Sequence, residues 1–284
     1  MMRLDRRSFC AATAAALVAS EPASAGRLFL PGGHRRSGAN LMIRGTLVAG
    51  MPAIPVMFGA AGPFLFEIAT VGSGFSIRSK LATQMGAQVR ADGTAELPPA
   101  FAADLALARP APAKLFEPGW PLPEPLAGVI GLDAFGALSL SLDLASGAVG
   151  IGPVSLPEPD GKTIFAYQGH AAPVVPVTVA GTTFPARIST GQIRAPLLLT
   201  PGLAETLAAG PPEDAGEAYA DGRRFELRRV ALKAPVAVGT RPLPASWAVF
   251  PGPSQENSLG ALGLAGLVLQ LDRLNRRVRI AAGA

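Results

Sequence analysis

The sequence repeats one arrangement of short apolar segments and turns, and this internal repeat constrains the fold more than any other feature. Each copy has an extended segment, a Gly-containing turn and a second extended segment: residues 54–58 and 64–73 in the first copy, and residues 175–179 and 184–191 in the second. Pro55 and Pro176 are 121 positions apart, and Ile68 and Ile188 are 120 apart. The unit is far longer than the roughly 20–50 residues of solenoid or propeller repeats. We therefore expect two similar folding units rather than an array.

The end of each copy repeats as well. Gly131-Leu132 leads to residues 138–143 in the first copy, and Gly263-Leu264 leads to residues 267–272 in the second. An Asp-Gly turn signal recurs at Asp92-Gly93 and Asp221-Gly222, which are 129 positions apart, as are Asp143 and Asp272. The small drift in offset is explained by short insertions.

The composition favours many short strands joined by turns. The chain of 284 residues has 33 Gly, 28 Pro and 49% hydrophobic residues, which is enough to bury a core. Only two short helices are predicted, over residues 79–85 before Gly86 and over residues 201–207 after Thr200. We therefore expect an all-β fold of two similar β-barrel-like lobes with a few short helices.

The first 25 residues have the features of an export signal. Arg6-Arg7 precede an apolar run over residues 10–20 and the small-residue sequence Ala23-Ser24-Ala25, which is typical of a twin-arginine signal peptide. The apolar run is shorter than the roughly 20 residues of a bilayer-spanning helix. We expect a periplasmic or secreted protein with no membrane anchor after cleavage. Its only cysteine, Cys10, lies in the signal, so the mature chain has no disulfide and no thiol nucleophile.

The chain after the signal divides by composition into four segments. After the signal, residues 26–46 are expected to be a linker, although residues 41–48 could form a first strand. A Pro-containing interval over residues 153–163 separates an N-terminal lobe, residues 47–152, from a C-terminal lobe, residues 164–284. Residues 110–125 are also Pro-rich, which indicates a surface loop over the first lobe.

Several functional classes are disfavoured. The formal net charge of +5 comes partly from arginines that alternate with apolar residues, as on the exposed face of a strand, so no nucleic-acid partner is predicted. There is no cysteine pair and no histidine cluster, and Gly72-Ser73-Gly74 lacks the lysine of a phosphate loop. We expect neither a metal nor a cofactor.

The repeated loops resemble those of aspartic peptidases of the pepsin and retropepsin type, in particular the exported two-lobed bacterial members. In that family each lobe has a strand, an Asp-Thr-Gly-Ala/Ser loop, a short helix and a later Gly-containing closing element. The corresponding loops here begin at Ala69 and Ser189, and the closing element over residues 128–135 is the most specific match. The resemblance covers about residues 47–284 and implies a two-lobed fold with a peptide-binding cleft between the lobes.

The departures from that family concern the catalytic positions. Its chemistry needs two facing carboxylates that share a proton, whereas Ala69 and Ser189 occupy those positions and neither ionises at working pH. Thr70 and Thr190 match the family threonines, whose hydroxyls are implied to bond across the lobe interface. Val71 replaces a family glycine and disfavours a turn with positive φ.

Other groups fit a catalytic role poorly. Glu67 shares a strand face with Ala69 but lies one step back from the loop, and Asp133 belongs to the closing turn. Asp143 and Asp272 match strand-end acids that are structural in the family. The two histidines of the mature chain are His34, in the linker, and His170, which would have to reach Ser189 to complete a triad.

Three functions remain open. The first is a non-catalytic protein that binds an extended peptide or protein segment in the interlobe cleft, through Thr70, Gly72, Ser73, Thr190 and Gly191, under a flap at Asp92-Gly93. The second is a hydrolase with rearranged groups, which predicts that Glu67 or Asp133 has a perturbed pKa and points into the cleft. The third is a structural interaction module whose cleft is filled by residues 110–125.

Overall fold

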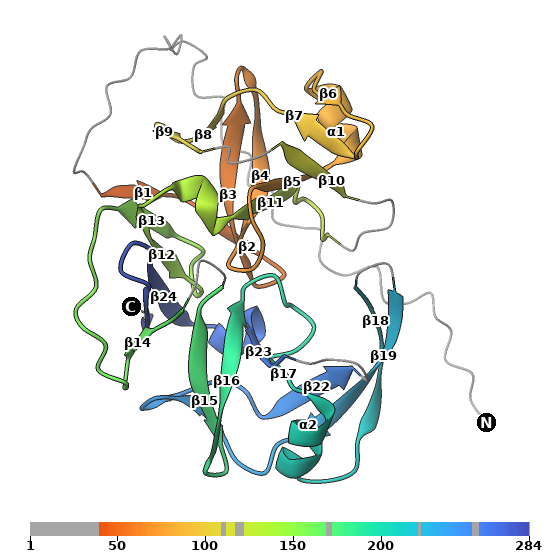
Figure 1. The fold of residues 1–284 in the computed structure, drawn as a ribbon, viewed down its shortest axis with the longest axis vertical. Coiled ribbons are helices and arrows are strands. Elements are labelled where there is room, and N and C mark those ends of the chain that lie inside the picture. Colours follow the sequence, from red (N-terminus) through yellow and green to blue (C-terminus); the bar gives the residue numbers. More distant parts are fainter. Residues whose placement is uncertain are drawn as a thin grey trace, which may run out of the picture. The chain divides into compact units, whose positions relative to one another are not determined.

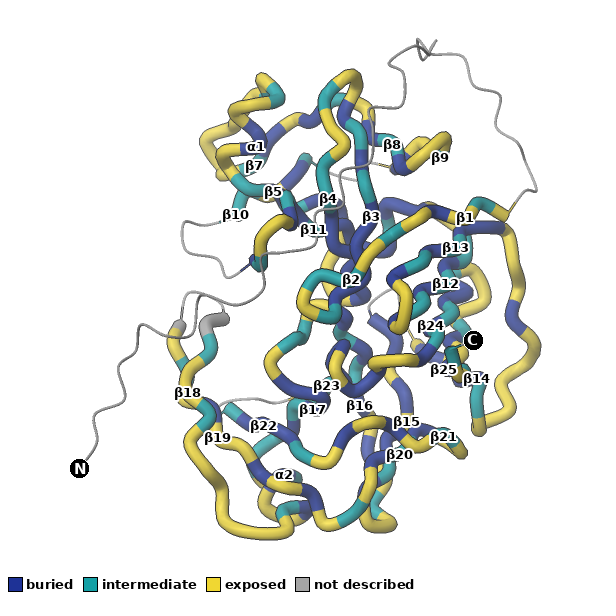
Figure 2. The backbone as a smooth tube through the Cα atoms, turned by 180° about the vertical axis from the view of Figure 1, so that it is seen from behind, coloured by how far each residue is buried: buried dark blue, intermediate teal, exposed yellow. Residues whose placement is uncertain are grey.

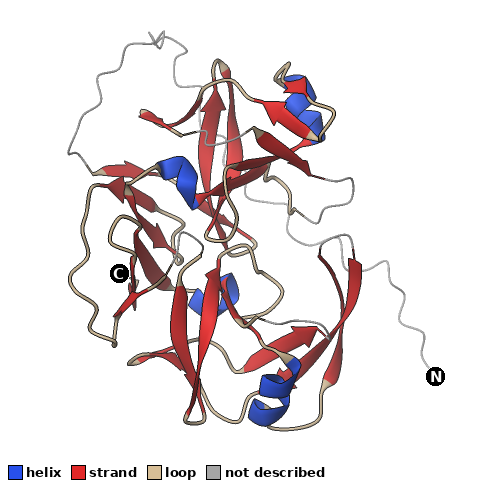
Figure 3. Cartoon of the chain, viewed as in Figure 1, coloured by secondary structure: helices blue, strands red, loops and turns tan. Residues whose placement is uncertain are grey.

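The computed structural model describes residues 40–108, 112–116, 122–168, 172–220, 223–251 and 256–283. Strands make up 51% and helices 9% of the structure, which confirms the prediction of an all-β chain (Figure 3). Residues 36–284 form one compact unit. In the part of the chain that the structure describes, no helix has the length and apolarity needed to cross a bilayer. The predicted signal peptide, His34 and His170 lie outside the described residues.

The first half of the compact unit contributes a ten-stranded sheet. Nine of its strands lie in the order β6 (Gln88–Val89), β7 (Thr94–Glu96), β10 (Ala113–Phe116), β5 (Phe75–Arg78), β11 (Gly128–Gly131), β4 (Ala61–Ala69), β3 (Met51–Phe58), β8 (Ala100–Ala102) and β9 (Leu105–Ala106). The tenth strand, β2 (Thr46–Val48), pairs with β3.

The second half contributes a nine-stranded sheet. Its order is β18 (Glu213–Ala220), β19 (Arg223–Ala231), β22 (Trp247–Pro251), β17 (Leu197–Leu198), β23 (Ser258–Gly260), β16 (Thr182–Ser189), β15 (Val174–Val179), β20 (Val236–Val238) and β21 (Arg241–Pro242). When the strands of each path are numbered in chain order, the two sheets have the same strand order, 4-5-8-3-9-2-1-6-7. Figure 1 shows one matching pair of hairpins, β3–β4 in the first half and β15–β16 in the second. The repeat seen in the sequence is therefore a repeat of topology.

A third sheet of six strands takes three strands from each half. Its order is β1 (Leu41–Ile43), β13 (Val149–Gly152), β12 (Ser139–Asp143), β24 (Leu267–Asp272), β25 (Arg277–Ala282) and β14 (Ile164–Ala166). The halves meet where β12 and β24 pair antiparallel, with Leu140 opposite Leu271. We call this the shared sheet.

Strand β1 corrects one expected boundary. Residues 26–46 were expected to be a linker, with a possible strand over residues 41–48. In the structure that stretch holds two strands, since Leu41–Ile43 pairs with β13 and Thr46–Val48 pairs with β3. The pairing partner of β1 lies more than 100 residues away, so composition near residue 41 does not reveal it. The interval 153–163 contains no strand, as predicted.

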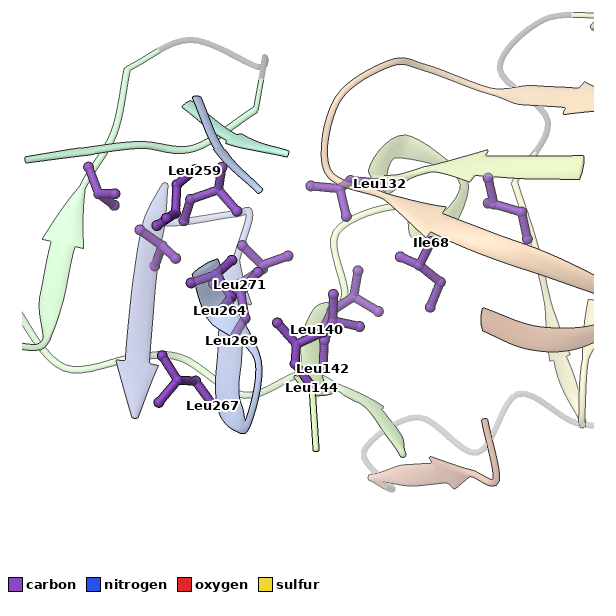
Figure 4. Close-up of a cluster of buried hydrophobic side chains, with 14 of the residues drawn as sticks. Ile68, Leu132, Leu140, Leu142, Leu144, Leu259, Leu264, Leu267, Leu269 and Leu271 are labelled. Carbon is purple, nitrogen blue, oxygen red and sulfur yellow. The ribbon is translucent and has the colours of Figure 1, made fainter. Parts of the chain in front are cut away.

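Leucines of the shared sheet form much of the core between the halves. Leu140 and Leu142 of β12 are buried with Leu269 and Leu271 of β24, and Figure 4 shows their side chains lying together with Leu264. These residues alternate with more polar positions along each strand, as expected where one face of a sheet is buried. The period-2 apolar pattern thus fixes how the two halves pack.

Both helices lie where they were predicted, and α1 ends one residue earlier than expected. Helix α1 (Ser79–Gln84) is followed by Gly86 at φ 64°, the left-handed conformation that glycine accommodates most easily. Helix α2 (Pro201–Leu207) begins after Thr200 with proline in its first turn. Short 3₁₀ helices, η1 (Leu132–Phe135) and η2 (Ala261–Leu264), follow β11 and β23 in the two halves.

Candidate functional site

Two loops with the same place in each half meet at the centre of the compact unit. Strand β4 ends at Ala69 and pairs parallel with β11, and β16 ends at Ser189 and pairs parallel with β23. After the first loop, β5 pairs with the other edge of β11, and after the second loop, β17 pairs with the other edge of β23. We call β11 and β23 the closing strands. We call the meeting point of the two loops the junction.

Glycines in the closing strands let the loops approach. A Cβ atom on Gly131 would lie 2.7 Å from the Cα of Ser73, and one on Gly260 would lie 2.6 Å from the carbonyl oxygen of Gln192. No side chain fits at either position without moving backbone. These glycines thereby set the position of both loops.

Thr70 and Thr190 tie the loops together. The amide of Thr70 donates to Oγ1 of Thr190 at 3.0 Å, and the amide of Thr190 donates to Oγ1 of Thr70 at 3.1 Å. The hydroxyl of Thr70 donates to the Ile188 carbonyl at 2.7 Å, and that of Thr190 donates to the Ile68 carbonyl at 2.9 Å. Both threonines are almost fully buried. These hydrogen bonds are reciprocal. They hold Ala69 and Ser189, the residues just before the two threonines, next to the opposite half.

Ala69 and Ser189 are the residues so fixed. Ala69 is 5% exposed and Ser189 is half-buried. Neither side chain carries a carboxyl group, so this pair has no proton to share and no base with which to activate a water.

The tips of both loops are exposed. Val71, Gly72 and Ser73 are exposed in the first loop, and Gly191 is exposed in the second. The positive φ angles of the first loop occur at Gly72 (106°) and Gly74 (64°) rather than at Val71. Because the left-handed positions lie after Val71, valine is accommodated there without backbone strain.

Asp133 supports the first loop. Its Oδ1 accepts a hydrogen bond from the amide of Gly74 at 2.7 Å and lies 2.8 Å from where a Cβ on Gly131 would be. This carboxylate therefore stabilises the conformation of the loop.

Asp143 and Asp272 shape the turns at the ends of β12 and β24. The carboxylate of Asp143 accepts bonds from Ser146 and from the amide of Ala145, which lower its pKa. Burial raises the pKa of Asp272, but hydrogen bonds from Asn275 and from the amide of Leu156 outweigh that effect and leave it below its ordinary value. The bond to Leu156 also anchors the interval between the halves.

Glu67 is the unusual group at the junction. It is only 3% exposed and lies between Ala53 of β3 and Val129 of β11 in the sheet register. Its Oε1 is buried without a hydrogen-bond partner. Desolvation by burial raises the pKa of this carboxyl to about 7. A buried acceptor with no donor is uncommon in folded proteins and requires an explanation.

Glu67 reaches across the junction to the second loop. A Cβ atom on Gly191 would lie 2.7 Å from Oε1 of Glu67 and 3.6 Å from its Cδ. The carboxyl therefore occupies the space that a side chain at position 191 would need. From its position in the sequence, Glu67 was expected to lie one step back from the loop of its own half. Its approach to Gly191 was not predicted, because that approach depends on how the halves meet.

An apolar face surrounds Glu67. Met51, Ala53, Leu122 and Leu126 are buried there, and five half-buried side chains pack against them: Val48, Leu65, Phe116, Val129 and Ile193. Ile193 belongs to the second loop, so this cluster joins both halves. Leu122 comes from the Pro-rich region 110–125, and Arg78 holds it through a bond from Nη2 to its carbonyl at 2.5 Å. The Pro-rich region thus covers part of this face, while residues 109–111 and 117–121 lie outside the described residues.

The Asp92-Gly93 turn joins β6 and β7 and is bonded locally. Oδ1 of Asp92 accepts bonds from the amide and hydroxyl of Thr94, which lower the pKa of Asp92, and the carbonyl of Gly93 accepts from the amide of Leu115. Strand β7 lies at the end of the first half farther from β16 (Figures 1 and 2). The turn is therefore not brought together with Thr70 and Thr190.

A hairpin of the second half does contact a junction loop. Arg194, which follows Ile193, donates from Nη1 to the Glu217 carbonyl of β18. Strands β18 and β19 form a long and largely exposed hairpin (Figure 2). Its tip is Asp221-Gly222, the repeat of the Asp92-Gly93 signal, and lies outside the described residues. The repeated turn signal was the available clue to this hairpin.

Other sites are few in the described ranges. Among these residues no three His, Cys, Asp or Glu side chains gather as metal ligands would. A hollow of about 180 Å³ lies on the shared sheet beside Asn40, Met42 and Ser141, and no junction residue lines it.

Comparison with known proteins returned no match: neither the scan against protein-family models nor the search of curated proteins gave one.

Proposed function

We propose that this chain is an exported, non-catalytic protein with a two-lobed scaffold of the aspartic-peptidase type, which binds an extended peptide or protein segment at the junction. The observation that carries this proposal is the reciprocal bonding of Thr70 and Thr190. It aligns Ala69 and Ser189 where a peptidase of this type needs two carboxylates. This bonding supports a scaffold of that type, and Ala69 and Ser189 would leave it without an acid–base pair.

Two features support binding of an extended segment. The tips of both loops are exposed, so backbone groups next to the threonines can meet a ligand. Strand β18 is the outermost strand of its sheet, pairs only with β19 among the described strands, and lies beside the second loop. An unpaired strand edge is a template for adding a peptide strand through main-chain hydrogen bonds.

The export signal belongs to the same proposal. A periplasmic or extracellular location, reached through the predicted signal peptide of residues 1–25, would place the binding surface among exported proteins and peptides. The proposal includes no cofactor, nucleic acid or membrane anchor.

Peptide capture tests this function. The mature chain from residue 26 onwards is immobilised and exposed to a diverse mixture of nonapeptides at neutral pH, and retained peptides are sequenced by mass spectrometry. We expect a subset to be retained and recovered uncut. Retention no greater than on a heat-unfolded sample of the same protein would refute peptide binding.

A second function, a hydrolase with a single rearranged carboxyl, is favoured by one observation. Glu67 has a pKa raised to about 7 and faces the opposite loop, which is the state expected of a general acid–base group. This function predicts that Glu67→Gln abolishes cleavage of the same peptide mixture. If the unsubstituted protein cleaves no peptide between pH 4 and pH 8, the hydrolase function is refuted.

A further inference from the structure

The unexplained group of the junction is the carboxyl of Glu67. Oε1 is fully enclosed and unpartnered, although it lies against Gly191, which is itself exposed. The carboxyl is therefore buried but close to the surface at which the proposed peptide would bind. A buried acceptor of this kind costs folding free energy unless a donor is supplied.

Within the described ranges, no side chain or amide donates a hydrogen bond to Oε1 of Glu67. Strands β3 and β11, which flank Glu67, contain no ionisable residue. Of the charged residues in the other described segments that supply this face, Arg194 bonds to the Glu217 carbonyl, Glu124 pairs with Arg78, and Lys114 of β10 is exposed to solvent. Desolvation by burial raises the pKa of this carboxyl. Among the described residues this carboxyl therefore has no partner, and a ligand with a positively charged or hydrogen-bond-donating group would supply one.

The surroundings restrict the shape of that group. Around the carboxyl the wall is apolar, with Leu65, Val129 and Ile193 half-buried. A lysine or arginine side chain combines a methylene stem, which packs on such a wall, with a cationic head that pairs with a carboxylate. A small hydrated cation would leave the apolar wall uncovered, and an acidic side chain would be repelled.

We propose that Glu67 is a specificity-determining residue that recognises a lysine or arginine side chain of the bound segment. This inference rests on the proposed peptide-binding function and adds the class of side chain that the junction selects. Gly191 contributes by having no side chain, because a Cβ atom there would lie 2.7 Å from Oε1 and would take the space beside the carboxyl. Asp133 and the carboxylates of the turns do not compete for this role because backbone amides already occupy them.

Matched peptides provide the test. Four nonapeptide libraries share randomised flanking positions and differ only in a fixed central residue: arginine, lysine, citrulline or norleucine. Citrulline keeps the shape of arginine without its charge, and norleucine keeps the stem of lysine. We expect the arginine and lysine libraries to bind at least about tenfold more tightly than their neutral counterparts at pH 8.

The pH dependence identifies the group responsible. With a pKa of about 7, Glu67 gains negative charge between pH 6 and pH 8. Arginine and lysine stay protonated across this range, so the preference for basic peptides should rise with pH. In Glu67→Gln the preference should fall to less than about twofold and lose its pH dependence. Glu96→Gln, the same change at an exposed carboxylate of the first half, should behave as the unsubstituted protein does.

The outcomes separate this inference from the function on which it rests. If no library binds, the proposed peptide binding fails, and the inference fails with it. If all four libraries bind equally, peptide binding stands and the role of Glu67 is refuted. A basic preference that persists in Glu67→Gln refutes the assignment to Glu67, and a preference lost in that variant but kept in Glu96→Gln supports it.

Discussion

The two halves carry opposite chemistry at the same place in the repeat. Glu67 and Arg187 each lie two residues before the end of the strand that leads into the junction. Glu67 is opposite Val129 of β11, and Arg187 is opposite Ser258 of β23. Glu67 is buried with an unpartnered oxygen, whereas the side chain of Arg187 is 32% exposed and forms an ion pair with Glu256 at 2.7 Å.

The neighbours of these residues differ in the same sense. The face around Glu67 is apolar, while Ser258, opposite Arg187, is hydrogen-bonded to Gln192. Backbone topology is thus retained in both halves, but the side chains that face the junction have diverged. A ligand at the junction would meet one apolar wall containing a carboxyl and one polar wall whose charges are already paired.

The largest expected effect concerns what the halves still share. Thr70→Val removes a hydroxyl that accepts from Thr190 and donates to Ile188, leaving two buried polar groups without partners. At about 1–3 kcal/mol for each, the free energy of unfolding should fall by about 4 kcal/mol. Urea denaturation measures this change.

An exposed threonine pair provides the control. Thr178→Val breaks a hydroxyl–hydroxyl contact with Thr183 on the surface and should cost less than about 1 kcal/mol. Equal losses at Thr70 and Thr178 would show that the junction bonds do not hold the halves together.

The next largest effect is a pH dependence of stability that is expected from Glu67 and not from Arg187. The pKa of Glu67 is about 7 in the folded protein and near 4.5 when unfolded, so the unfolded state loses its proton first as pH rises. Stability contributed by the protonated carboxyl is present below pH 4.5 and is lost as pH rises to about 7, by up to about 3 kcal/mol. Glu67→Leu should remove this loss, and unfolding measured at pH 4.5, 6 and 8 would show it.

Glu256→Gln is the matched change in the second half. It removes an exposed carboxylate and should leave the pH dependence assigned to Glu67 unchanged. If Glu67→Leu and the unsubstituted protein lose stability in parallel between pH 4.5 and pH 7, the account of Glu67 is wrong.

A smaller effect tests the contact between Glu67 and Gly191. Gly191→Ala places a methyl group where the carboxyl lies, and the flexible glutamate has to shift, so a cost of about 1 kcal/mol is expected. In a Glu67→Ala background the same change should cost nothing, because the obstructing carboxyl is gone. Additive free energies in this double-mutant cycle would contradict the contact.

The smallest expected effect concerns Arg187. Because its ion pair with Glu256 is partly exposed, Glu256→Gln should change the free energy of unfolding by less than about 0.5 kcal/mol at neutral pH. Raising the salt concentration to 1 M should remove most of that difference. If Glu256→Gln lowers the free energy of unfolding by more than about 2 kcal/mol, the second half depends on the ion pair of Arg187 as strongly as the first half depends on the carboxyl of Glu67.

The sequence predicted the features that depend on local pattern. Apolar alternation, turn residues and repeat offsets were sufficient for the all-β class, the duplicated unit and helices α1 and α2. The expected meeting of Thr70 with Thr190 is also present in the structure. The class, the duplicated unit and the helices follow from patterns that occur twice in the chain, whereas the contact between the threonines was implied by the resemblance to aspartic peptidases.

Features that depend on contacts between distant segments were not predictable. Strand β1 pairs with β13, and its own three residues carry no signal of that partner. Glu67 faces Gly191 only because the halves pack with their loops interlocked. The hairpin at Asp92-Gly93 was expected to cover the junction, but the hairpin beside the second loop is β18–β19. The same turn signal occurs in both hairpins and does not encode their different lengths.

Cleavage of a diverse peptide mixture tests the central claim most directly. The mature protein would be compared from pH 3 to pH 7 with an Ala69→Asp, Ser189→Asp variant, which restores two carboxylates where the threonine bonds align them. Val71 is retained, since its backbone needs no positive φ. The account predicts that the unsubstituted protein leaves the mixture intact and that the variant cuts it at acid pH; cleavage by the unsubstituted protein would contradict it.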